Sequence, residues 1–327
     1  FQDIDVITGS QKVLENMLAS GRYRHVLVHF LDRDMWAVLE KFIDHIKVTV
    51  WVHGAEIHPW YRRKYNIQTM AQEEVAKAAS ETRMAFWRDI LKPMHSNLKL
   101  VFVSHYFAGE VMEDLGFELP KDHYEVIHNP IKTNLFNYLE KPATQRKKII
   151  SIRPFTSRQY ANDLTVNAIF ELSKRPYFDE LEFRIIGDGP LFEETVELIK
   201  DFSNVILEKR FVSQPEIAQL HKEYGVFLCP TRWDSQGVSR DEAMASGLVP
   251  ITNAVAAIPE FVDERCGVLV GAEDHLGMAR GISMLYQAPE KFLAMSKEAA
   301  QRVRKQSDVE KVINQELSIF SVVRHSI

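Results

Sequence analysis

Two acidic residues, Asp234 and Glu242, stand eight positions apart around a glycine loop in the segment 229–251. An apolar run typical of a buried strand precedes the loop, and a short helical pattern and a second apolar run follow it. Such a unit belongs to a parallel sheet, which binds ligands at the carboxyl ends of its strands. Backbone N–H groups at the start of a helix suit a phosphate. We therefore expect an anion site in this loop, formed by Ser235, Gln236, Gly237 and Val238.

The same residues permit a purely structural interpretation. Ser239 and Glu242 form an S-x-x-E capping box, in which Glu242 would serve only the start of a helix. Spacing alone does not decide between the two interpretations.

Two arginines follow the strand pattern at residues 149–152. Arg153 comes directly after it, and Arg158 comes five positions later. Two guanidiniums at the carboxyl end of a strand can clamp a diphosphate, because they combine fixed positive charge with forked donors. The structural alternative is a solvated loop with surface arginines.

Glycines and a further arginine follow the next two strand patterns. Gly187 and Gly189 enclose Asp188 between a strand and a helix, and Arg210 and Phe211 follow the strand after that. Glycine lets the backbone approach a ligand closely, although strand-to-helix turns also use it routinely. The pair is therefore a weak signal by itself.

Three features of the first half have competing interpretations. His53 ends the strand pattern 48–52, where a histidine is either a ligand contact or a satisfied polar group. Asp32 and Asp34 form a D-x-D, but they open a helix, so we favour an N-cap and a first-turn charge over a metal pair. No other spacing suggests a metal. The aromatic and basic stretch 60–65 suits an anionic membrane surface, although a solvated loop is favoured.

Composition indicates a globular chain with room for two domains. The 327 residues are 46% hydrophobic and 26% charged. A net charge of −5 argues against a protein devoted to nucleic acid. No apolar run approaches the roughly 20 residues that span a bilayer, and Cys229 and Cys266 read as buried thiols in a reducing compartment. We expect a cytoplasmic protein, with peripheral contact to the inner face of the membrane left open.

Strand and helix patterns alternate along the chain, which indicates parallel sheets covered by helices. The strands are expected at 26–30, 48–52, 98–103, 124–127, 149–152, 181–186, 205–207, 226–229, 249–252 and 267–270. The main helices are expected at 69–91, 106–115, 163–174, 191–202, 214–223, 240–246, 258–262 and 275–287, with two more in 289–320. The proline-containing basic stretch 130–148 is interpreted as a domain linker.

Together these segments resemble the retaining glycosyltransferases of family four. The segment 229–251 resembles their donor-site signature, in which two acids flank seven residues and an E-A-M-A-x-G helix follows. Asp234 stands where that family usually has Glu. The segment 153–158 resembles the family's arginine-then-lysine diphosphate clamp, with Arg158 in place of lysine. The resemblance runs from about His53 to the end of the chain and is strongest over 149–270.

The resemblance implies an α/β protein of the GT-B fold, with two Rossmann-like parallel-sheet domains facing a cleft and a helical C-terminal tail. We expect an acceptor-side domain at 1–135, whose short stretch 1–24 indicates that part of it is missing, reduced or truncated, and a nucleotide-sugar domain at 136–310. A helix at 311–327 would pack back towards the first domain.

The activity implied is that of a metal-independent, retaining hexosyltransferase. It would move a sugar from a nucleotide-diphosphate donor, UDP favoured over GDP, to a glycan or lipid-linked acceptor in cell-surface polysaccharide synthesis, without a cofactor. By the resemblance, Arg153, Arg158 and Asp234 act at the donor, and His53 faces the donor sugar. Glu242 would hold the ribose. The nucleotide would contact Gly187, Asp188, Gly189, Arg210 and Phe211.

Three other functions were weighed. A non-catalytic nucleotide-sugar-binding or scaffold subunit with the same fold is the main alternative. A nucleotide-sugar epimerase would need acid–base residues at the sugar carbon, for which only His53 and scattered acids are candidates. A dinucleotide dehydrogenase is disfavoured, since no strand is followed by G-x-G-x-x-G.

Overall fold

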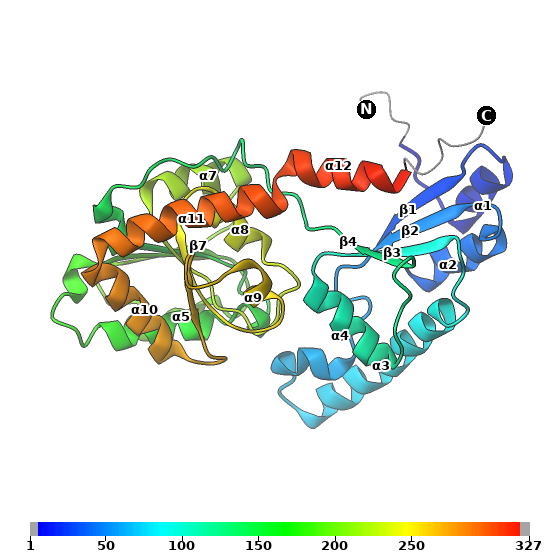
Figure 1. Cartoon of the computed structure of the whole chain (residues 1–327). Helices are drawn as coiled ribbons and strands as arrows, with labels where there is room; N and C mark the ends of the chain where they lie inside the picture. The colour runs from blue at the N-terminus through cyan, green and yellow to red at the C-terminus, as the bar shows by residue number, and fades with distance from the viewer. Residues whose placement is uncertain (1–5, 321–327) are drawn as a thin grey trace. The chain divides into compact units, whose positions relative to one another are not determined.

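The computed structural model describes residues 6–320, which form two α/β units (Figure 1). Unit 1 comprises residues 6–62 and 67–127, and unit 2 comprises residues 63–66 and 128–320. The division falls at 127/128, whereas the sequence placed it at 135/136. The expected linker therefore belongs to unit 2, where the backbone N–H of Ile131 donates to the carbonyl of Ser307 at 2.7 Å. Of the expected C-terminal segment, residues 321–327 lie outside the described part.

Unit 1 contains a four-stranded parallel sheet in the order β1-β2-β3-β4. Each connection moves to the next strand, so the order does not reverse within the unit. The strands are β1 (His25–His29), β2 (Lys47–Trp51), β3 (Leu98–Phe102) and β4 (Tyr124–Val126). The helices are α1 (Gln11–Ala19), α2 (Arg33–Leu39), α3 (Met70–Leu91) and α4 (His105–Leu115).

Local sequence determines where the helices of unit 1 begin and end. The side chain of Asp32 accepts a hydrogen bond from the N–H of Met35 at 2.8 Å, which confirms it as the N-cap of α2. Thr69 and Gln72 form a capping box at the start of α3, and Gly116 ends α4 in the left-handed conformation. In residues 6–320, no group of three His, Cys, Asp or Glu side chains could hold a metal ion.

Unit 2 contains a six-stranded parallel sheet in the order β10-β9-β8-β5-β6-β7. Chain order runs outward from β5 on one side and from β8 on the other, so the order reverses between these two strands. Open α/β sheets bind ligands at the carboxyl ends of the strands at such a reversal. The strands are β5 (Lys148–Ile152), β6 (Glu182–Gly187), β7 (Val205–Lys209), β8 (Val226–Leu228), β9 (Val249–Asn253) and β10 (Val268–Val270).

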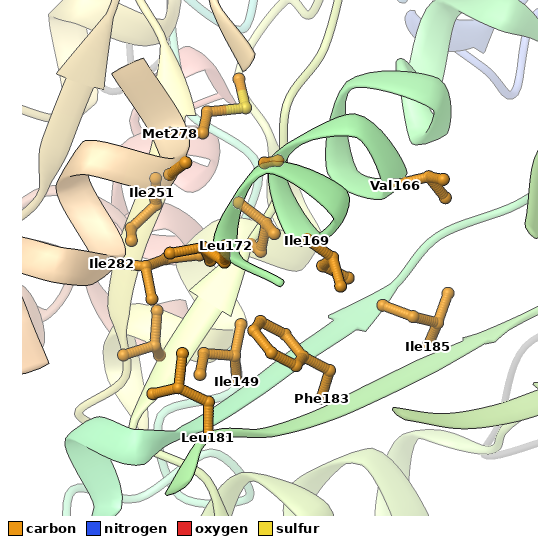
Figure 2. Packing of buried hydrophobic residues seen from close by; sticks show 14 of the residues in the cluster. Ile149, Val166, Ile169, Leu172, Leu181, Phe183, Ile185, Ile251, Met278 and Ile282 are labelled. Carbon is orange, nitrogen blue, oxygen red and sulfur yellow. The ribbon is translucent and has the colours of Figure 1, made fainter. Parts of the chain in front are cut away.

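Helices of unit 2 bury apolar stripes against this sheet (Figure 2). Ile169 and Leu172 on one helix, and Met278 and Ile282 on another, have no solvent-exposed surface. Their spacing of three or four residues places each pair on one helix face. The helices are α5 (Asn162–Leu172), α6 (Phe192–Val196), α7 (Gln214–Glu223), α8 (Val238–Ala245), α9 (Ile258–Phe261), α10 (His275–Gln287), α11 (Pro289–Ser307) and α12 (Val309–Phe320).

The expected strands and main helices are confirmed, with three differences. α1 was not expected, although its apolar residues recur at helical spacing in QKVLENMLA. The helix expected at 191–202 is shorter in the structure: α6 ends at Val196, and a 3₁₀ helix follows at Glu197–Ile199. α8 begins two residues earlier than expected. None of the helices in residues 6–320 combines the length and apolar character that a membrane crossing requires.

Candidate functional site

Arg153 lies directly after β5, at the point where the strand order of unit 2 reverses. Its side chain is buried, with 5% of the residue exposed. The Nη1 atom donates to the hydroxyl of Ser239 at 2.8 Å, and the guanidinium lies 4.9 Å from the ring centre of Tyr160. The Nε atom is buried and has no hydrogen-bond partner in the described part of the chain. The guanidinium is thus fixed in place with one donor still to be satisfied.

The N-terminus of α8 forms without the capping box that the sequence allowed. Gly237 occupies the N-cap position in the left-handed conformation, with φ +95°, and no side chain caps the helix. Ser239 lies within the first turn, and its hydroxyl accepts from Arg153 instead. The capping-box interpretation of Ser239 and Glu242 is therefore wrong. A Cβ at Gly237 would lie 2.8 Å from Nη1 of Arg240, a further reason for glycine there.

The side chain of Gln236 has a structural role, while the expected anion contact of its loop stays a prediction. The residue is completely buried. Its side-chain oxygen accepts from the N–H of Asn129 at 2.6 Å, and its Nε2 donates to Asp241 Oδ2 at 3.0 Å and to the carbonyl of Asn129 at 3.2 Å. Its backbone N–H donates to Asp234 Oδ1 at 3.1 Å. Gln236 therefore fixes the loop 234–238 to the chain that enters unit 2.

A buried ion pair on α8 supports the same loop. Arg240 Nη2 and Asp241 Oδ1 are 2.6 Å apart, and each side chain is 2% exposed. The guanidinium of Arg240 also lies 5.2 Å from the ring centre of Phe261. Burial raises the pKa of Asp241 despite its partner. These contacts hold the loop in one conformation before any ligand binds, which favours electrostatic stabilisation of a charged group.

Glu242 lies in the middle of α8 and is largely buried. Its Oε1 accepts from Nε2 of Gln214 at 3.2 Å. Burial, followed by the charge of Asp241, raises the pKa of Glu242 to about 7. A carboxyl group whose pKa lies near neutrality and which does not cap a helix is a candidate for binding a ligand.

A cavity of about 200 Å³ brings together three of the sequence-predicted groups. These are the loops that follow β5, β6 and β7, all at the carboxyl edge of the sheet. Arg210 is held there by Glu208 and Glu216, whereas Phe211 is 85% exposed. The lining consists of Ile152, Arg153, Pro154, Gly187, Asp188, Arg210, Phe211, Val212 and Ile217. These lining residues do not include Asp234, which precedes α8, or Glu242, which lies within it.

Gly187 and Gly189 allow two loops to pack directly on each other. A Cβ at Gly187 would lie 1.9 Å from the carbonyl oxygen of Arg153, and one at Gly189 would lie 2.3 Å from the carbonyl carbon of Phe155. The N–H of Phe155 also donates to the carbonyl of Asp188 at 2.8 Å. The close approach that these glycines permit is therefore to the neighbouring loop, which carries Arg153. Their contact with a nucleotide stays a prediction.

Arg158 differs from Arg153 in its surroundings. Its side chain is 37% exposed, and its Nη2 lies 3.8 Å from the carboxylate of Glu194. Its backbone N–H donates at 3.1 Å to Asn66 Oδ1, which also accepts from the hydroxyl of Ser157 at 2.9 Å. Asn66 was not a candidate, because nothing in its local sequence indicates a contact 92 positions away. It fixes the backbone of the loop that carries Arg158.

His53 lies beyond the carboxyl end of β2 and is hydrogen-bonded to a second histidine that the sequence did not indicate. Its Nε2 is 3.0 Å from Nδ1 of His29 at the end of β1. Its ring stacks on Phe30 with 4.4 Å between centres, and its backbone N–H donates to Glu56. Burial lowers the pKa of His53, so the imidazole is neutral near pH 7.

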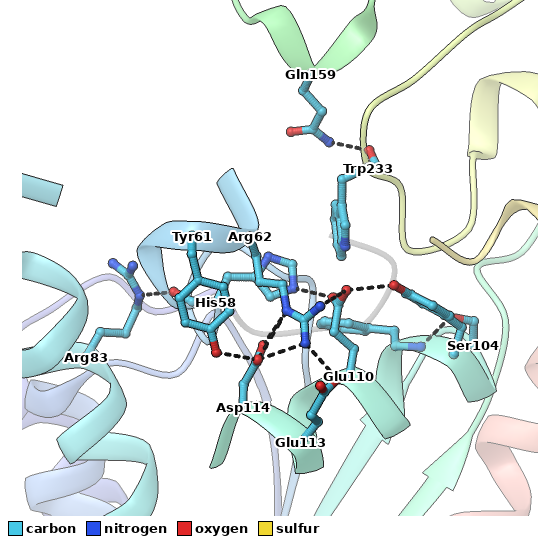
Figure 3. Close-up of polar contacts among 12 residues, drawn as sticks. His58, Tyr61, Arg62, Arg83, Ser104, Glu110, Glu113, Asp114, Gln159 and Trp233 are labelled. Atoms are coloured by element: carbon cyan, nitrogen blue, oxygen red, sulfur yellow. Dashed lines mark hydrogen bonds and ion pairs between the residues drawn. The ribbon is translucent and has the colours of Figure 1, made fainter. Parts of the chain in front are cut away.

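Two side chains of the aromatic and basic stretch 60–65, those of Tyr61 and Arg62, contact acidic residues of α4 in unit 1 (Figure 3). Arg62 binds Asp114 through Nε and Nη2 and lies 3.5 Å from Glu110, and the hydroxyl of Tyr61 donates to Asp114 at 2.7 Å. His58 pairs with the other oxygen of Glu110 at 3.1 Å. The guanidinium of Arg62 and the hydroxyl of Tyr61 thus have a structural role, and contact of the stretch 60–65 with a membrane stays a prediction.

Known proteins share parts of this sequence and its fold. Residues 146–288 match the family model described as Glycosyl transferases group 1. The N-acetyl-alpha-D-glucosaminyl L-malate synthase of Bacillus anthracis is 26% identical over 232 residues, which cover 67% of this chain and 58% of that protein. The chain therefore spans less than two thirds of the length of this relative.

Two solved structures show the similarity of fold. The sucrose-phosphate synthase of Thermosynechococcus elongatus gives a TM-score of 0.76 at 17% identity, over 95% of this chain and 76% of that one. Anabaena HepE, solved in complex with UDP and glucose, gives 0.69 at 14% identity, over 95% and 81%. The chain thus has the GT-B fold, and its residues 146–288 match the group 1 glycosyl transferases.

Proposed function

We propose that this protein is a retaining glycosyltransferase. It transfers a hexosyl group from a nucleotide-diphosphate sugar, with UDP as the nucleotide, to a glycan or lipid-linked acceptor in cell-surface polysaccharide synthesis. The observation that carries this proposal is Arg153, a buried guanidinium with an unsatisfied donor at the strand reversal of unit 2. The family match of the same region and the UDP complex of Anabaena HepE support the class of donor.

The diphosphate of the donor would bind between Arg153 and the N-terminus of α8. Both supply fixed positive potential where negative charge develops as the bond between the sugar C1 and the phosphate oxygen breaks. The acceptor hydroxyl forms the new bond to C1 on the same face, and its proton passes to the departing phosphate oxygen. Neither the bond exchange nor the proton transfer requires a protein base or a metal ion.

The other predicted residues have supporting roles in this proposal. Asp234 accepts hydrogen bonds from the sugar hydroxyls, and Glu242 from the ribose hydroxyls. Arg158 adds positive charge near the diphosphate, and the exposed ring of Phe211 with Arg210 contacts the base. His53 is the residue proposed for the donor sugar, as a neutral imidazole, the state that its lowered pKa favours.

A non-catalytic nucleotide-sugar-binding subunit remains the second candidate. The observation in its favour is the difference between the units in the described residues, since the sheet of unit 1 has four strands and that of unit 2 has six. Such a subunit would bind the donor but would neither transfer the sugar nor hydrolyse the donor. Detection of either reaction with the purified protein excludes it.

Thermal stability in the presence of nucleotides tests the donor site. We expect UDP and UDP-sugars to raise the melting temperature more than GDP or ADP, because ligand that binds only the folded state adds about 2.7 kcal/mol of stability at 100 times its Kd. Donors that stabilise the protein are then incubated with candidate acceptors, and released UDP is measured. If no nucleotide raises the melting temperature at millimolar concentration, the proposed function is wrong.

The affinity for UDP-glucose should depend on pH through Glu242. With a folded pKa of about 7, this carboxyl is mostly protonated at pH 6 and mostly ionised at pH 8. If the ionised form accepts the ribose hydroxyls, affinity should rise about tenfold over that range. UDP-glucose is the suitable probe, because its diphosphate lacks the terminal phosphate that titrates in UDP. Calorimetry should show the rise in the wild type and a flat profile in Glu242→Gln, whereas equal slopes would assign the dependence to another group.

A further inference from the structure

A second cavity, of about 270 Å³, lies entirely within unit 1. Its lining comes from the chain after β1, from the chain after β2 and from one face of α3. The first two segments follow the carboxyl ends of neighbouring parallel strands, which is where α/β sheets bind ligands. The lining residues are Leu31, Asp32, Arg33, Glu56, Ala79, Thr82, Arg83 and Phe86.

Glu56, one of the lining residues, has a buried acceptor that is not satisfied. Its Oε1 accepts from the backbone N–H of His53, and its carbonyl accepts from Nε1 of Trp87 at 2.6 Å. These bonds fix both the backbone and the side chain of the residue. Its Oε2 is buried and has no hydrogen-bond partner in the described part of the chain. A buried carboxylate oxygen of this kind is costly unless a donor reaches it, so the site requires a ligand group that donates.

Arg33, an exposed residue, supplies donors to the same lining as Glu56. Its Nη2 donates to the carbonyl of Thr82 at 2.9 Å, and its guanidinium lies 5.6 Å from the ring centre of Phe86. One bond and one ring contact orient a group that has five N–H donors. Arg83 is oriented in a similar way, since its Nε donates to the carbonyl of His58 at 2.8 Å.

The charges of the lining favour an uncharged ligand. The two guanidiniums are matched by two carboxylates, Asp32 and Glu56, so the formal charge of the lining is zero. An anion would meet the unpartnered oxygen of Glu56, and a cation would meet Arg33. A sugar ring avoids both, because its hydroxyls donate and accept while its C–H face packs on apolar and aromatic side chains such as Leu31 and Phe86.

We propose that this cavity binds an uncharged pyranose of the acceptor. A sugar hydroxyl donates to Glu56 Oε2, and a second hydroxyl accepts from Arg33. The inference rests on the proposed function and deepens it, since it names the class of acceptor and the residues that hold it. Within unit 1, Glu56 also accepts from the backbone N–H of His53.

Saturation-transfer NMR of the whole chain tests the inference with defined probes. The methyl α-pyranosides of glucose, galactose, mannose and N-acetylglucosamine are tested at up to 100 mM, with L-malate and inorganic phosphate as anionic probes in parallel by calorimetry. Glu56→Gln keeps an oxygen for the N–H of His53 but places an amide donor where Oε2 was. Glu74→Gln, at an exposed position on α3 outside the cavity lining, is the matched control.

We expect at least one pyranoside to bind the wild type and Glu74→Gln equally, and Glu56→Gln at least tenfold more weakly. Binding that is unchanged in Glu56→Gln, binding of no pyranoside, or binding of malate or phosphate but of no pyranoside would each overturn the inference. The thermal shift with UDP separates this result from the proposed function. Glu56→Gln should keep that shift, so loss of sugar binding with retained nucleotide binding assigns the defect to unit 1.

Discussion

Replacement of Arg153 by alanine should lower the rate of sugar transfer about 10²–10³-fold, with the fold preserved. This is the effect of removing one fixed donor that stabilises charge in the transition state. Arg153 is buried, and one of its nitrogens has no partner in the described residues, so its interaction with a diphosphate would be little weakened by solvent. The measurement is single-turnover transfer or donor hydrolysis with saturating UDP-sugar, which separates chemistry from binding.

Two further variants make this result specific to the guanidinium. Arg153→Lys keeps the charge but loses Nε and the forked geometry, so it should recover only part of the rate. Ser239→Ala removes the bond that orients Nη1 and keeps the charge, and its loss should be smaller than that of Arg153→Ala. Melting temperatures establish that all three variants are folded. Transfer at the wild-type rate in Arg153→Ala would show that the diphosphate does not bind at Arg153.

Replacement of Arg62 by methionine should destabilise unit 1 by about 3–5 kcal/mol. The guanidinium binds Asp114 and lies 3.5 Å from Glu110, and both acidic side chains are 2% exposed. Methionine fills similar space but carries no charge, so the buried carboxylate of Asp114 would lose its cationic partner and that of Glu110 would keep only its other contacts, such as His58. Removing one partner of a buried ion pair has this magnitude because the remaining charge stays desolvated.

Chemical denaturation followed by tryptophan fluorescence measures this effect. Four of the five tryptophans, at positions 36, 51, 60 and 87, belong to unit 1, so the signal reports mainly on that unit. Glu113→Gln is the control, since Glu113 contacts the same arginine at 2.8 Å but its side chain is 75% exposed. Its effect should stay within about 0.5 kcal/mol. Similar losses in the two variants would show that burial is not what makes the network strong.

The secondary structure could be predicted from the sequence because it depends on local patterns. The apolar run that forms β8 and the cap at Asp32 involve residues within a few positions of one another. The same patterns placed Arg153, Gly187 and Arg210 after successive strands. Since parallel strands end at one edge of their sheet, the three could be expected near one another, and one cavity contains all of them.

Several roles around the loops could not be predicted, because they depend on partners distant in the chain. Ser239 fits a capping box by spacing, yet its hydroxyl accepts from Arg153, 86 positions away. Gln236 is expected in an anion-binding loop, yet its side-chain oxygen and nitrogen both bond to the backbone of Asn129, 107 positions away. In each case the role depends on a contact with a residue far away in the chain, which no local pattern records.

The sequence by itself determined the alternating elements, the strand ends that carry charged residues and the glycines that a positive φ or close packing requires. Only the tertiary structure decided that the strand order reverses between β5 and β8, that Arg153 is fixed there with a donor unsatisfied, and that Glu56 faces a separate cavity in unit 1. The physical reason is that periodicity records which face of an element is buried. Which elements become neighbours, and which buried polar atoms remain unpaired, depends on contacts between residues far apart in the chain.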